Sequence, residues 1–487
     1  MARVVVLGGG VSGLVAARAL AGAHEVTLLE ASAVPGGKLC TGTLGGRRID
    51  LGPDAFITRD PAAVELCREL GLGDDLRPPA ATGVALFHRG RLRALPPGLN
   101  LGVPTDLGAL WRSGALSRRG VARAALDLAL PRGVTAVAPD ATLGSGAADP
   151  TIATVLGRLG PEVLDALVEP LLGGINAGDV RELSLAATAP GLATALAGRR
   201  SVLRALRNTS SAAGAATGPL FLGVRGGMGR LVDALVAQCE GAGVEIVCNE
   251  PVLTLRRGAP GGPAWSVRSA SAERGADGVV CALPAHPAAT VLAEAAPELA
   301  AEYVAMVYAS VATVTFVWPE AAVPLSTTNA LGHAGSGVGP LPGNGVLVAR
   351  DGRHLATALT FVSTKWPDTA APGQVVVRVS CGRAGDARLD GLGDDSLVAA
   401  LRREVAETLA VTAPPLDTIV QRWPGSFPQP VRGHRARQER LRAQARALPA
   451  FALCGAAIQG IGIPACIRSG RLAADQVAGG LDGDRPA

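Results

Sequence analysis

The apolar positions of the first thirty residues predict a strand, a helix and a second strand. Val4 to Leu7 is a short β-branched run bounded by glycine, which is typical of a buried parallel strand. Leu14 to Leu20 is rich in Ala and Leu and predicts a helix, and Glu25 to Leu29 predicts the second strand. A glycine-rich turn separates the first strand from the helix.

The same patterns predict most elements of the remaining chain. We expect helices over 61–70, 397–409 and 465–477, a β-hairpin over 84–95, and strands over 310–318, 345–349, 355–361 and 374–380. From about 105 to 212 the chain is rich in Ala, Leu and Arg at helical spacing, which predicts a mainly helical insertion. The low-complexity stretch 208–218 predicts a linker.

The turn after the first strand fits the pattern G-x-G-x-x-G. In such a unit one glycine makes the tight turn, a second lets the backbone approach a pyrophosphate, and the third lets helix and strand pack closely. Glu30 ends the second strand, where a carboxylate accepts hydrogen bonds from ribose hydroxyls. We therefore predict dinucleotide binding, against the alternative of a glycine-rich turn in another kind of α/β protein.

Composition and charge narrow the class of protein. A chain of 487 residues with 48% apolar residues predicts two or three domains with sizeable cores. A net charge of +5 without runs of like charge speaks against nucleic-acid binding. The eight cysteines form no C-x-x-C pair, so we predict no metal site and buried thiols in a reducing cytoplasm. Because the first strand starts at residue 4, we expect no targeting sequence.

Two further glycine motifs favour a flavin over a nicotinamide cofactor. Pro35-Gly36-Gly37-Lys38 follows Glu30 closely, and Gly52-Pro53-Asp54-Ala55 follows the next strand. Flavoproteins of the glutathione-reductase superfamily place such elements along the FAD phosphates and beside the isoalloxazine ring. The alternative is two ordinary Gly/Pro loops.

Two more segments can face a flat ligand. Glu169 to Asp179 is too rich in glycine for a plain helix, and a backbone packed against a flat molecule would account for it. The loop Gly460 to Pro464 opens the last helix, whose N-terminus we expect at the flavin pyrimidine edge, where reduced flavin is negative. The alternative is a helix that only packs.

Together these segments resemble the protoporphyrinogen/coproporphyrinogen oxidase family over nearly the whole chain. The most particular pieces are Glu169 to Asp179 and Gly460 to Gly470, while the N-terminal pieces also resemble monoamine oxidases and phytoene desaturases. The resemblance implies an α/β fold with a Rossmann-like FAD-binding domain of the glutathione-reductase/monoamine-oxidase type. We expect this domain over 1–77, 219–288 and 424–487, a mixed-sheet substrate domain over 78–104 and 289–423, and the helical insertion over 105–218.

The resemblance also implies site residues. For FAD they are Gly8, Gly9, Gly10, Val11, Ser12, Gly13, Glu30, Ala31, Lys38, Gly52, Pro53, Asp54, Ala55, Val252, Trp423, Ile461, Gly462 and Ile463. For the substrate they are Arg93, Gly174, Asn176, Ala177 and Gly178, with Arg91 as the alternative to Arg93 for binding a propionate. No catalytic residue is implied, and His434 is the histidine we would test. Asn176 departs from the family, which usually has an aromatic residue there.

The implied activity is FAD-dependent oxidation of coproporphyrinogen III to coproporphyrin III in haem biosynthesis. Three two-electron steps would use O2 and release hydrogen peroxide. The alternatives are a protoporphyrinogen IX oxidase, and a flavin amine oxidase or carotenoid desaturase on the same scaffold; a binding protein without turnover is a further one. We expect a cytoplasmic protein that has no nucleic-acid partner. Weak contact with a membrane or with a haem-pathway enzyme is compatible with this expectation. The oligomeric state does not follow from the sequence.

Overall fold

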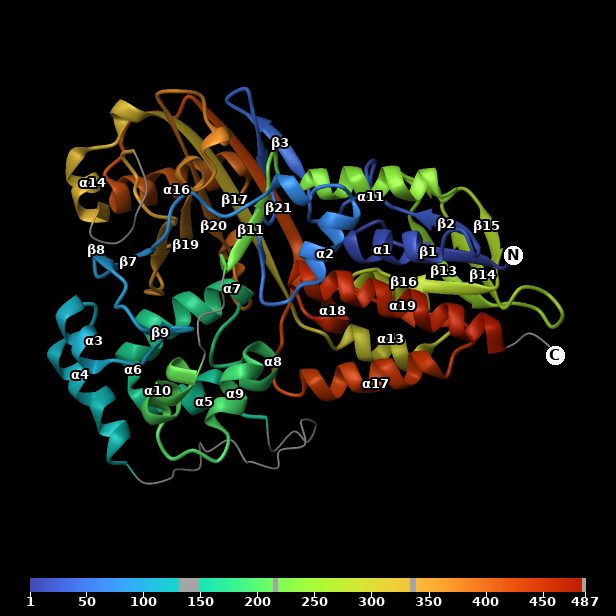
Figure 1. The fold of residues 1–487 in the computed structure, drawn as a ribbon, viewed down its shortest axis with the longest axis horizontal. Coiled ribbons are helices and arrows are strands. Elements are labelled where there is room, and N and C mark those ends of the chain that lie inside the picture. Colours follow the sequence, from blue (N-terminus) through green and yellow to red (C-terminus); the bar gives the residue numbers. More distant parts are fainter. Residues whose placement is uncertain (131–148, 213–217, 333–338, 484–487) are drawn as a thin grey trace.

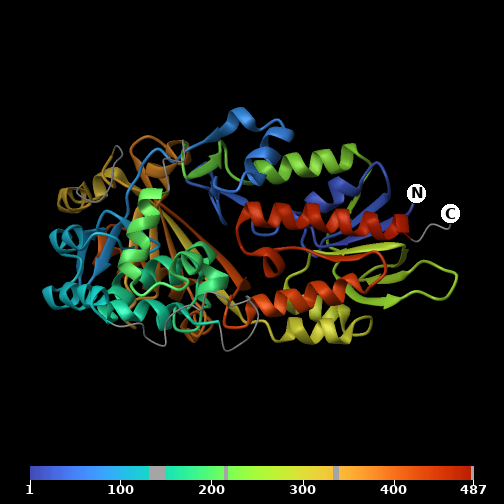
Figure 2. The ribbon, with the colours of Figure 1, turned by 60° about the horizontal axis from the view of Figure 1, so that its bottom comes forward.

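The computed structural model describes residues 1–130, 149–212, 218–332 and 339–483 and confirms the α/β fold with a Rossmann-like part (Figure 1). A parallel sheet with its helices occupies one end of an elongated molecule, together with both termini. A large mixed sheet and a layer of helices form the other end. Figure 2 shows the same division after a turn of the molecule.

The parallel sheet has five strands in the order β12-β2-β1-β16-β22. Its central strand β1 carries the buried run Val4 to Leu7, so both of its faces are covered, as the continuous apolar run predicts. The strands are β1 (Arg3–Leu7), β2 (Glu25–Leu29), β12 (Glu245–Val247), β16 (Gly278–Cys281) and β22 (Phe451–Leu453).

Two layers cover this sheet, each with its own apolar core. One layer consists of the helices α1 (Val11–Leu20), α2 (Ala62–Glu69), α11 (Gly229–Gly241) and α19 (Ile463–Gly483). The other consists of α12 (Ala285–Leu292), α13 (Pro297–Val304), α17 (His434–Arg446) and the antiparallel strands β13 (Val252–Arg257), β14 (Trp265–Ser269) and β15 (Glu273–Ala276).

The mixed sheet has seven strands in the order β21-β17-β20-β19-β18-β7-β8, and only β18 and β7 pair in parallel. Leu397, Leu401, Val405 and Leu409 of α16 (Asp394–Leu409) lie four residues apart and are fully buried in the core on one face of it. The strands are β7 (Ala85–His88), β8 (Arg91–Ala94), β17 (Tyr308–Pro319), β18 (Gly345–Val348), β19 (Ala356–Phe361), β20 (Gln374–Cys381) and β21 (Asp417–Pro428). Two short helices accompany them, α14 (Leu325–Gly332) and α15 (Val362–Lys365).

The predicted insertion is helical and shares one core with the β7/β18 end of the mixed sheet. Its most unusual element is a π-helix over Leu164–Gly173 that contains Pro170. This π-helix explains why the pattern of the glycine-rich stretch did not predict a regular α-helix. The other elements are β9 (Leu99–Asn100), β10 (Val103–Pro104), α3 (Leu107–Ser113), α4 (Arg118–Ala125), α5 (Ile152–Leu156), α6 (Pro161–Val163), α7 (Gly174–Asn176), α8 (Leu185–Thr188), α9 (Pro190–Leu196) and α10 (Val202–Ala212).

Short strands connect the two ends of the molecule. The hairpin of β3 (Thr41–Leu44) and β4 (Arg47–Asp50) packs Leu44 and Ile49 against Val317 and Val376 of the mixed sheet. A second small sheet joins β5 (Phe56–Ile57), β11 (Phe221–Val224) and β6 (Leu76–Arg77).

Two expected boundaries differ from the structure. The expected linker 208–218 is wrong in its first part, because 208–212 continue α10, whereas 213–217 lie outside the described residues. The expected domain boundary after residue 288 falls inside α12, and both α12 and α13 belong to the core of the parallel sheet. We therefore propose that the mixed-sheet domain begins at β17, while the division into domains stays a prediction.

Candidate cofactor and substrate site

The glycines of the first turn are required by close packing. Gly8 has φ +100°, and a Cβ added at Gly13 would lie 2.0 Å from the Gly8 carbonyl oxygen. The helix α1 could not approach β1 this closely with any side chain at Gly13. The Ser12 hydroxyl donates to the Cys466 carbonyl oxygen at 2.9 Å, which ties the turn to α19.

Glu30 lies where the sequence predicts a ribose-binding carboxylate, at the end of β2 beside the turn. One carboxylate oxygen accepts from the Gly9 N–H at 2.7 Å and the other from the Ser32 N–H at 2.8 Å. The Glu30 carbonyl oxygen accepts from the Glu250 N–H at 2.8 Å, which brings Val252 at the start of β13 near this end of the site.

A continuous path of close backbone contacts runs away from Glu30. The Gly36 N–H donates to the Gly9 carbonyl oxygen at 2.8 Å. A Cβ at Gly37 would lie 3.4 Å from the Gly10 Cα. Farther on, a Cβ at Gly52 would lie 1.9 Å from the Lys38 carbonyl oxygen and 3.8 Å from the Trp423 ring. The three predicted glycine motifs are therefore one track, with Glu30 at one end and Trp423 of β21 at the other.

The track fits an extended ligand with phosphates in its middle. A Cβ at Gly10 or Gly460 would meet nothing within 4 Å, so both glycines border open space. The half-buried Lys38 ammonium has no hydrogen bond or ion pair to any residue that the structure describes, and burial lowers the pKa of its amine. An unpaired amine beside open glycines is what a phosphate group requires.

The C-terminal loop closes the side of the track next to Lys38. Ile461 and Gly462 lie between Gly460, with φ +110°, and α19, which begins at Ile463. The helix α18 (Ala456–Gln459) lies directly before this loop. Two residues of α17 donate hydrogen bonds to its backbone, and the sequence did not indicate them. The Gln438 amide donates to the Ala457 carbonyl oxygen at 3.0 Å, and the Arg442 guanidinium donates to the Ile458 carbonyl oxygen at 2.5 Å.

The turn at Gly52 is anchored by side chains from the mixed-sheet end. Lys365 Nζ lies 2.8 and 3.0 Å from the two carboxylate oxygens of Asp54, and the Trp366 indole N–H donates to the same carboxylate at 3.0 Å. Burial alone would raise the pKa of Asp54, but Lys365 and Arg378 outweigh it and hold that pKa below its usual value. Asp54 is thus a buried anion with a structural role.

The predicted substrate segment is fixed by backbone contacts from the mixed sheet. Ala177 has φ +48°, and its carbonyl oxygen accepts from the Ala384 N–H at 2.8 Å. The buried Gln429 amide donates to the Asn176 carbonyl oxygen at 2.9 Å. A Cβ at Gly178 would lie 2.5 Å from the Gln429 side-chain oxygen, so any side chain there would displace the Gln429 amide. The sequence did not indicate Gln429 as a site residue.

Within this segment the buried and exposed side chains differ from the expectation. The Asn176 side chain is buried and its amide donates to the Leu172 carbonyl oxygen at 2.8 Å. Ile175 is instead 57% exposed, and a Cβ at Gly174 would border open space. The apolar side chain that this segment presents is Ile175, which the turn after the π-helix orients outward.

A buried ionic cluster lies behind the segment. Glu169 of the π-helix is 1% exposed and accepts from the Val180 N–H at 3.1 Å and from Arg383 at 3.1 Å. Arg350 bridges Glu169, at 3.5 Å, and Asp179, at 2.6 Å. Burial raises the pKa of Glu169 despite these donors. The cluster joins both ends of the glycine-rich stretch to the mixed sheet.

Two residues that the sequence singled out make no hydrogen bond or ion pair with this segment in the described part of the chain. Arg93 lies on the edge strand β8, with Nη1 3.1 Å from the position of a Cβ at Gly114, and no hydrogen bond or ion pair of the described chain joins it to 174–178. His434 begins α17 and is buried, which lowers its pKa to about 4. His434 therefore stays neutral near pH 7, and we infer a structural role.

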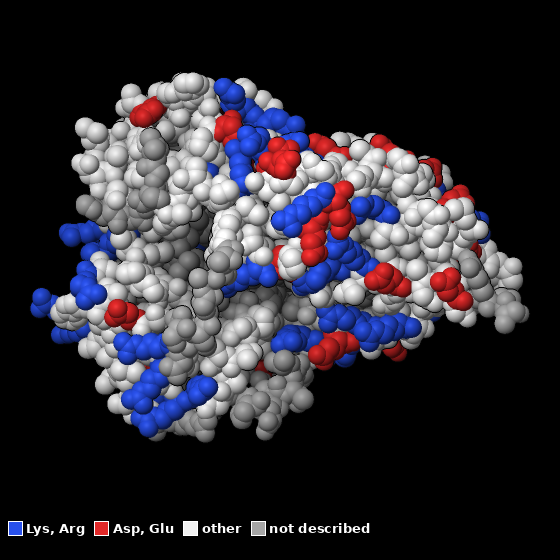
Figure 3. Space-filling view, in the orientation of Figure 1, with Lys and Arg blue, Asp and Glu red and all other residues white. Residues whose placement is uncertain are grey.

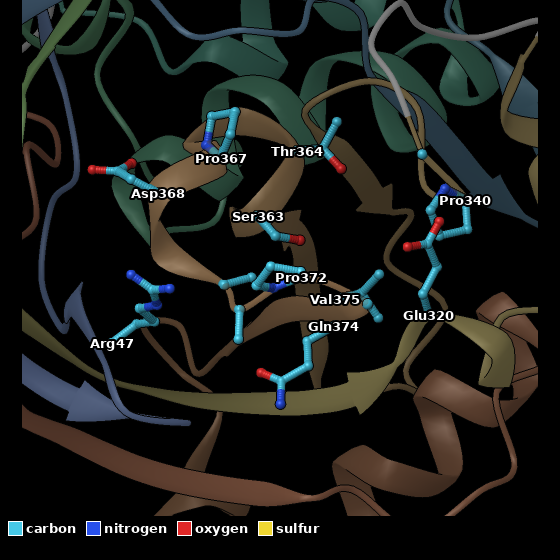
Figure 4. Close-up of a pocket in the computed structure, with 14 residues that line it drawn as sticks. Arg47, Glu320, Pro340, Ser363, Thr364, Pro367, Asp368, Pro372, Gln374 and Val375 are labelled. Atoms are coloured by element: carbon cyan, nitrogen blue, oxygen red, sulfur yellow. The ribbon is translucent and has the colours of Figure 1, made fainter.

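A pocket of about 370 Å³ lies beside α15 and β20 and contains none of the predicted site residues (Figure 4). Three of its polar side chains have partners within the protein. Thr364 donates to the Leu341 carbonyl oxygen at 2.9 Å, the Ser363 hydroxyl accepts from the Val376 N–H at 3.0 Å, and Asp368 pairs with Arg77 at 2.5 Å. We assign it no function.

The chain matches known proteins over nearly its whole length. The family described as flavin containing amine oxidoreductase matches residues 11–478. The coproporphyrinogen III oxidase of Mycobacterium leprae (strain TN) is 34% identical, over 95% of this chain and 95% of that protein. The coproporphyrinogen III oxidase of Bacillus subtilis (strain 168) is 31% identical, over 96% of each. The crystal structure of a protein from Exiguobacterium sp. 255-15, provisionally named a protoporphyrinogen oxidase, superposes with TM-score 0.82 at 27% identity, over 99% of each chain.

Proposed function

The chain belongs to the flavin containing amine oxidoreductase family, and from this premise we propose that it oxidises coproporphyrinogen III to coproporphyrin III in haem biosynthesis. Its cofactor is FAD. The glycine track from Glu30 to Trp423 supports this cofactor, because it is a line of closely approaching backbone with open space at Gly10, where a pyrophosphate would lie.

One observation above all supports a substrate bound next to the flavin end of the cofactor track. The far end of the cofactor track and the segment 174–178 are held by the same two strands of the mixed sheet. Strand β21 carries Trp423 and leads directly to Gln429, and β20 leads directly to Ala384. We infer that a flat ring lying on the backbone of 174–178 would lie on the Trp423 side of the track rather than at its Glu30 end.

The proposed chemistry needs position more than acid–base groups. FAD, when bound, supplies an acceptor for a hydride from a meso carbon of the porphyrinogen. The chain's part is to hold one face of the macrocycle in place, through the backbone of 174–178 and the Ile175 side chain, while a pyrrole N–H gives its proton to solvent. We propose that the predicted site residues contribute in this way, and that Arg93 binds a propionate.

The oxidant is part of the proposal. Conversion to a porphyrin removes six electrons, in three steps of two, and three molecules of O2 would accept them as three molecules of hydrogen peroxide. Aerobic turnover of the purified yellow protein on coproporphyrinogen III tests the use of O2 and the release of peroxide. Porphyrin is measured by fluorescence, and peroxide is measured in the same reaction. We expect three peroxides for each porphyrin formed.

The same assay separates the candidate substrates. Coproporphyrinogen III carries four propionates and protoporphyrinogen IX two. Protoporphyrinogen IX is the second candidate substrate, because the Exiguobacterium protein is provisionally named a protoporphyrinogen oxidase. Faster turnover of coproporphyrinogen III supports the proposal. A preference for protoporphyrinogen IX, or no porphyrin from either although FAD is bound, contradicts it.

We propose a cytoplasmic location with peripheral contact to membranes. No helix in the described part of the chain is long and apolar enough to span a bilayer. On the insertion, Trp111 is 51% and Leu126 is 52% exposed, and the Arg118 guanidinium lies 5.6 Å from the Trp111 ring centroid. Figure 3 shows Lys and Arg side chains on the surface of this end of the molecule. The other exposed arginines of the insertion include Arg112, Arg119, Arg199, Arg200, Arg204 and Arg207. Exposed Trp beside arginines suits the headgroup layer of an anionic membrane.

A further inference from the structure

We propose that Arg378 is a positioning residue for the flavin, which fixes the turn Asp50–Asp54 and supplies the positive charge that favours the reduced cofactor. Arg378 lies in the middle of β20, on the mixed sheet, and the sequence did not indicate it. The inference rests on FAD binding and does not depend on which porphyrinogen is oxidised.

Arg378 contacts the backbone of the turn Asp50–Asp54. Its guanidinium donates to the Gly52 carbonyl oxygen at 3.0 Å and also to the Asp50 carbonyl oxygen. The residue is 6% exposed, and its Nε–H is buried with no partner in the described part of the chain. A buried guanidinium that donates to two carbonyl oxygens restricts the movement of a backbone turn.

The neighbouring charges leave Arg378 as the excess cation. The Lys365 ammonium is neutralised by Asp54, which it contacts through both carboxylate oxygens. The Asp50 carboxyl accepts from the Met228 N–H at 2.8 Å and is buried, which raises its pKa to about 7. Below pH 7 the protonated form of Asp50 dominates, so the charge of Arg378 is not neutralised there. Cys40 also faces this group, and burial raises the pKa of its thiol.

The position of the turn explains why the charge would act on the flavin. The track places Glu30, the predicted ribose site, at one end and Gly52 with Trp423 at the other. The flavin ring is the end of FAD farthest from the adenosine, so with the adenosine at Glu30 it would lie toward Gly52. Reduction by two electrons and one proton leaves one negative charge on the ring. A buried guanidinium behind the turn at Gly52 would stabilise that charge more than one in water does.

The test compares the reduction potential of bound FAD in the holoenzyme and in Arg378→Gln and Arg378→Lys, by anaerobic dye equilibration at pH 6. For R378Q we expect the ratio of reduced to oxidised flavin at a fixed potential to fall about tenfold, which is about 30 mV for a two-electron couple. R378K keeps the charge and should stay within threefold of wild type. Sulfite, which adds to the flavin ring and leaves it negative, should bind R378Q about tenfold more weakly.

Arg422→Gln is the matched control. Arg422 is the residue before Trp423 on β21, and it also donates to two carbonyl oxygens, those of Leu389 and Leu392. Its side chain reaches Asp394 at the start of α16, so we expect no change in potential or sulfite affinity. A wild-type potential in R378Q, or an equal shift in R422Q, would overturn the proposal. None of these readouts uses a porphyrinogen, so a failure of the proposed substrate leaves the test intact.

Discussion

At the scale of single residues, burial and nearby charges set the pKa of a carboxyl group, which the residue type alone does not fix. Asp50 is 7% exposed at the end of β4, and its carboxyl accepts hydrogen bonds from the Met228 and Gly229 N–H groups. The desolvation of the charged form outweighs these donors and the charge of Arg378, so the pKa rises from 3.8 to about 7. Asp54, four residues away, keeps its charge because Lys365 contacts it directly.

Asp50 makes stability depend on pH. Between pH 4 and pH 7 the unfolded chain loses the Asp50 proton while the folded protein keeps it, so the free energy of unfolding falls as pH rises through this window. The fall contributed by this one group is at most about 4 kcal/mol. Asp50→Asn keeps an acceptor for Met228 and cannot titrate, so the stability difference between D50N and wild type should grow in favour of D50N across the window.

Denaturant unfolding at fixed FAD concentration, from pH 4 to pH 8, measures this difference. Asp233→Asn is the control, because the Asp233 side chain is 69% exposed, and its difference from wild type should stay constant. A constant difference for D50N as well would show that Asp50 is ionised in the folded protein throughout.

At the scale of elements, local patterns placed most helices and strands within a few residues. The strand expected over 310–318 is β17 (Tyr308–Pro319), and the helix expected over 465–477 is α19 (Ile463–Gly483). The π-helix and the left-handed Ala177 were not predictable, because both depend on tethers from distant elements. Gln429 supplies one of those tethers from a residue just beyond β21.

Gln429→Leu tests whether this tether shapes the substrate site. The variant leaves the Asn176 carbonyl oxygen without its donor, at a cost of about 1–3 kcal/mol. We expect KM for coproporphyrinogen III to rise about tenfold and kcat to change less than threefold. Gln476→Leu removes a similar amide donor, to the Phe451 carbonyl oxygen, and should leave KM unchanged. A fall in kcat at constant KM would contradict a role in binding.

At the scale of the whole molecule, each functional part combines segments far apart in the chain. The parallel sheet takes β22 from near the C-terminus to lie beside β16, and the hairpin β3–β4 reaches across to the mixed sheet. The helical insertion lies at the end of the molecule away from both termini (Figure 1). Trp111 and several of its arginines are exposed there.

The outward face of the insertion predicts salt-sensitive membrane binding. Wild-type protein should sediment with vesicles that contain phosphatidylserine and be released by 0.5 M salt, because arginines near an anionic surface contribute about 1 kcal/mol each. The double variant Trp111→Ala, Arg118→Gln should bind about tenfold more weakly. Leu325→Ala removes a side chain that is 80% exposed on α14 and should change nothing. Equal binding by all three proteins would contradict contact through the insertion.

The sequence by itself determined the dinucleotide unit, the other glycine motifs, the alternation of strands and helices, and the family. These features are local, because a turn that needs Gly8 or Gly13, or a buried strand such as β1, is fixed by residues that are neighbours in the chain. The order of motifs along the chain was enough to indicate FAD.

Only the tertiary structure decided which side chains hold the site in place. Arg378 reaches the turn at Gly52 from another sheet, Gln429 holds Asn176 across 253 residues, and Ile175 rather than Asn176 is exposed. The tertiary structure also placed α12 and α13 with the parallel sheet. Such contacts depend on how separate elements pack, and no spacing of residues in the sequence reports the distance between two faces that meet only after folding.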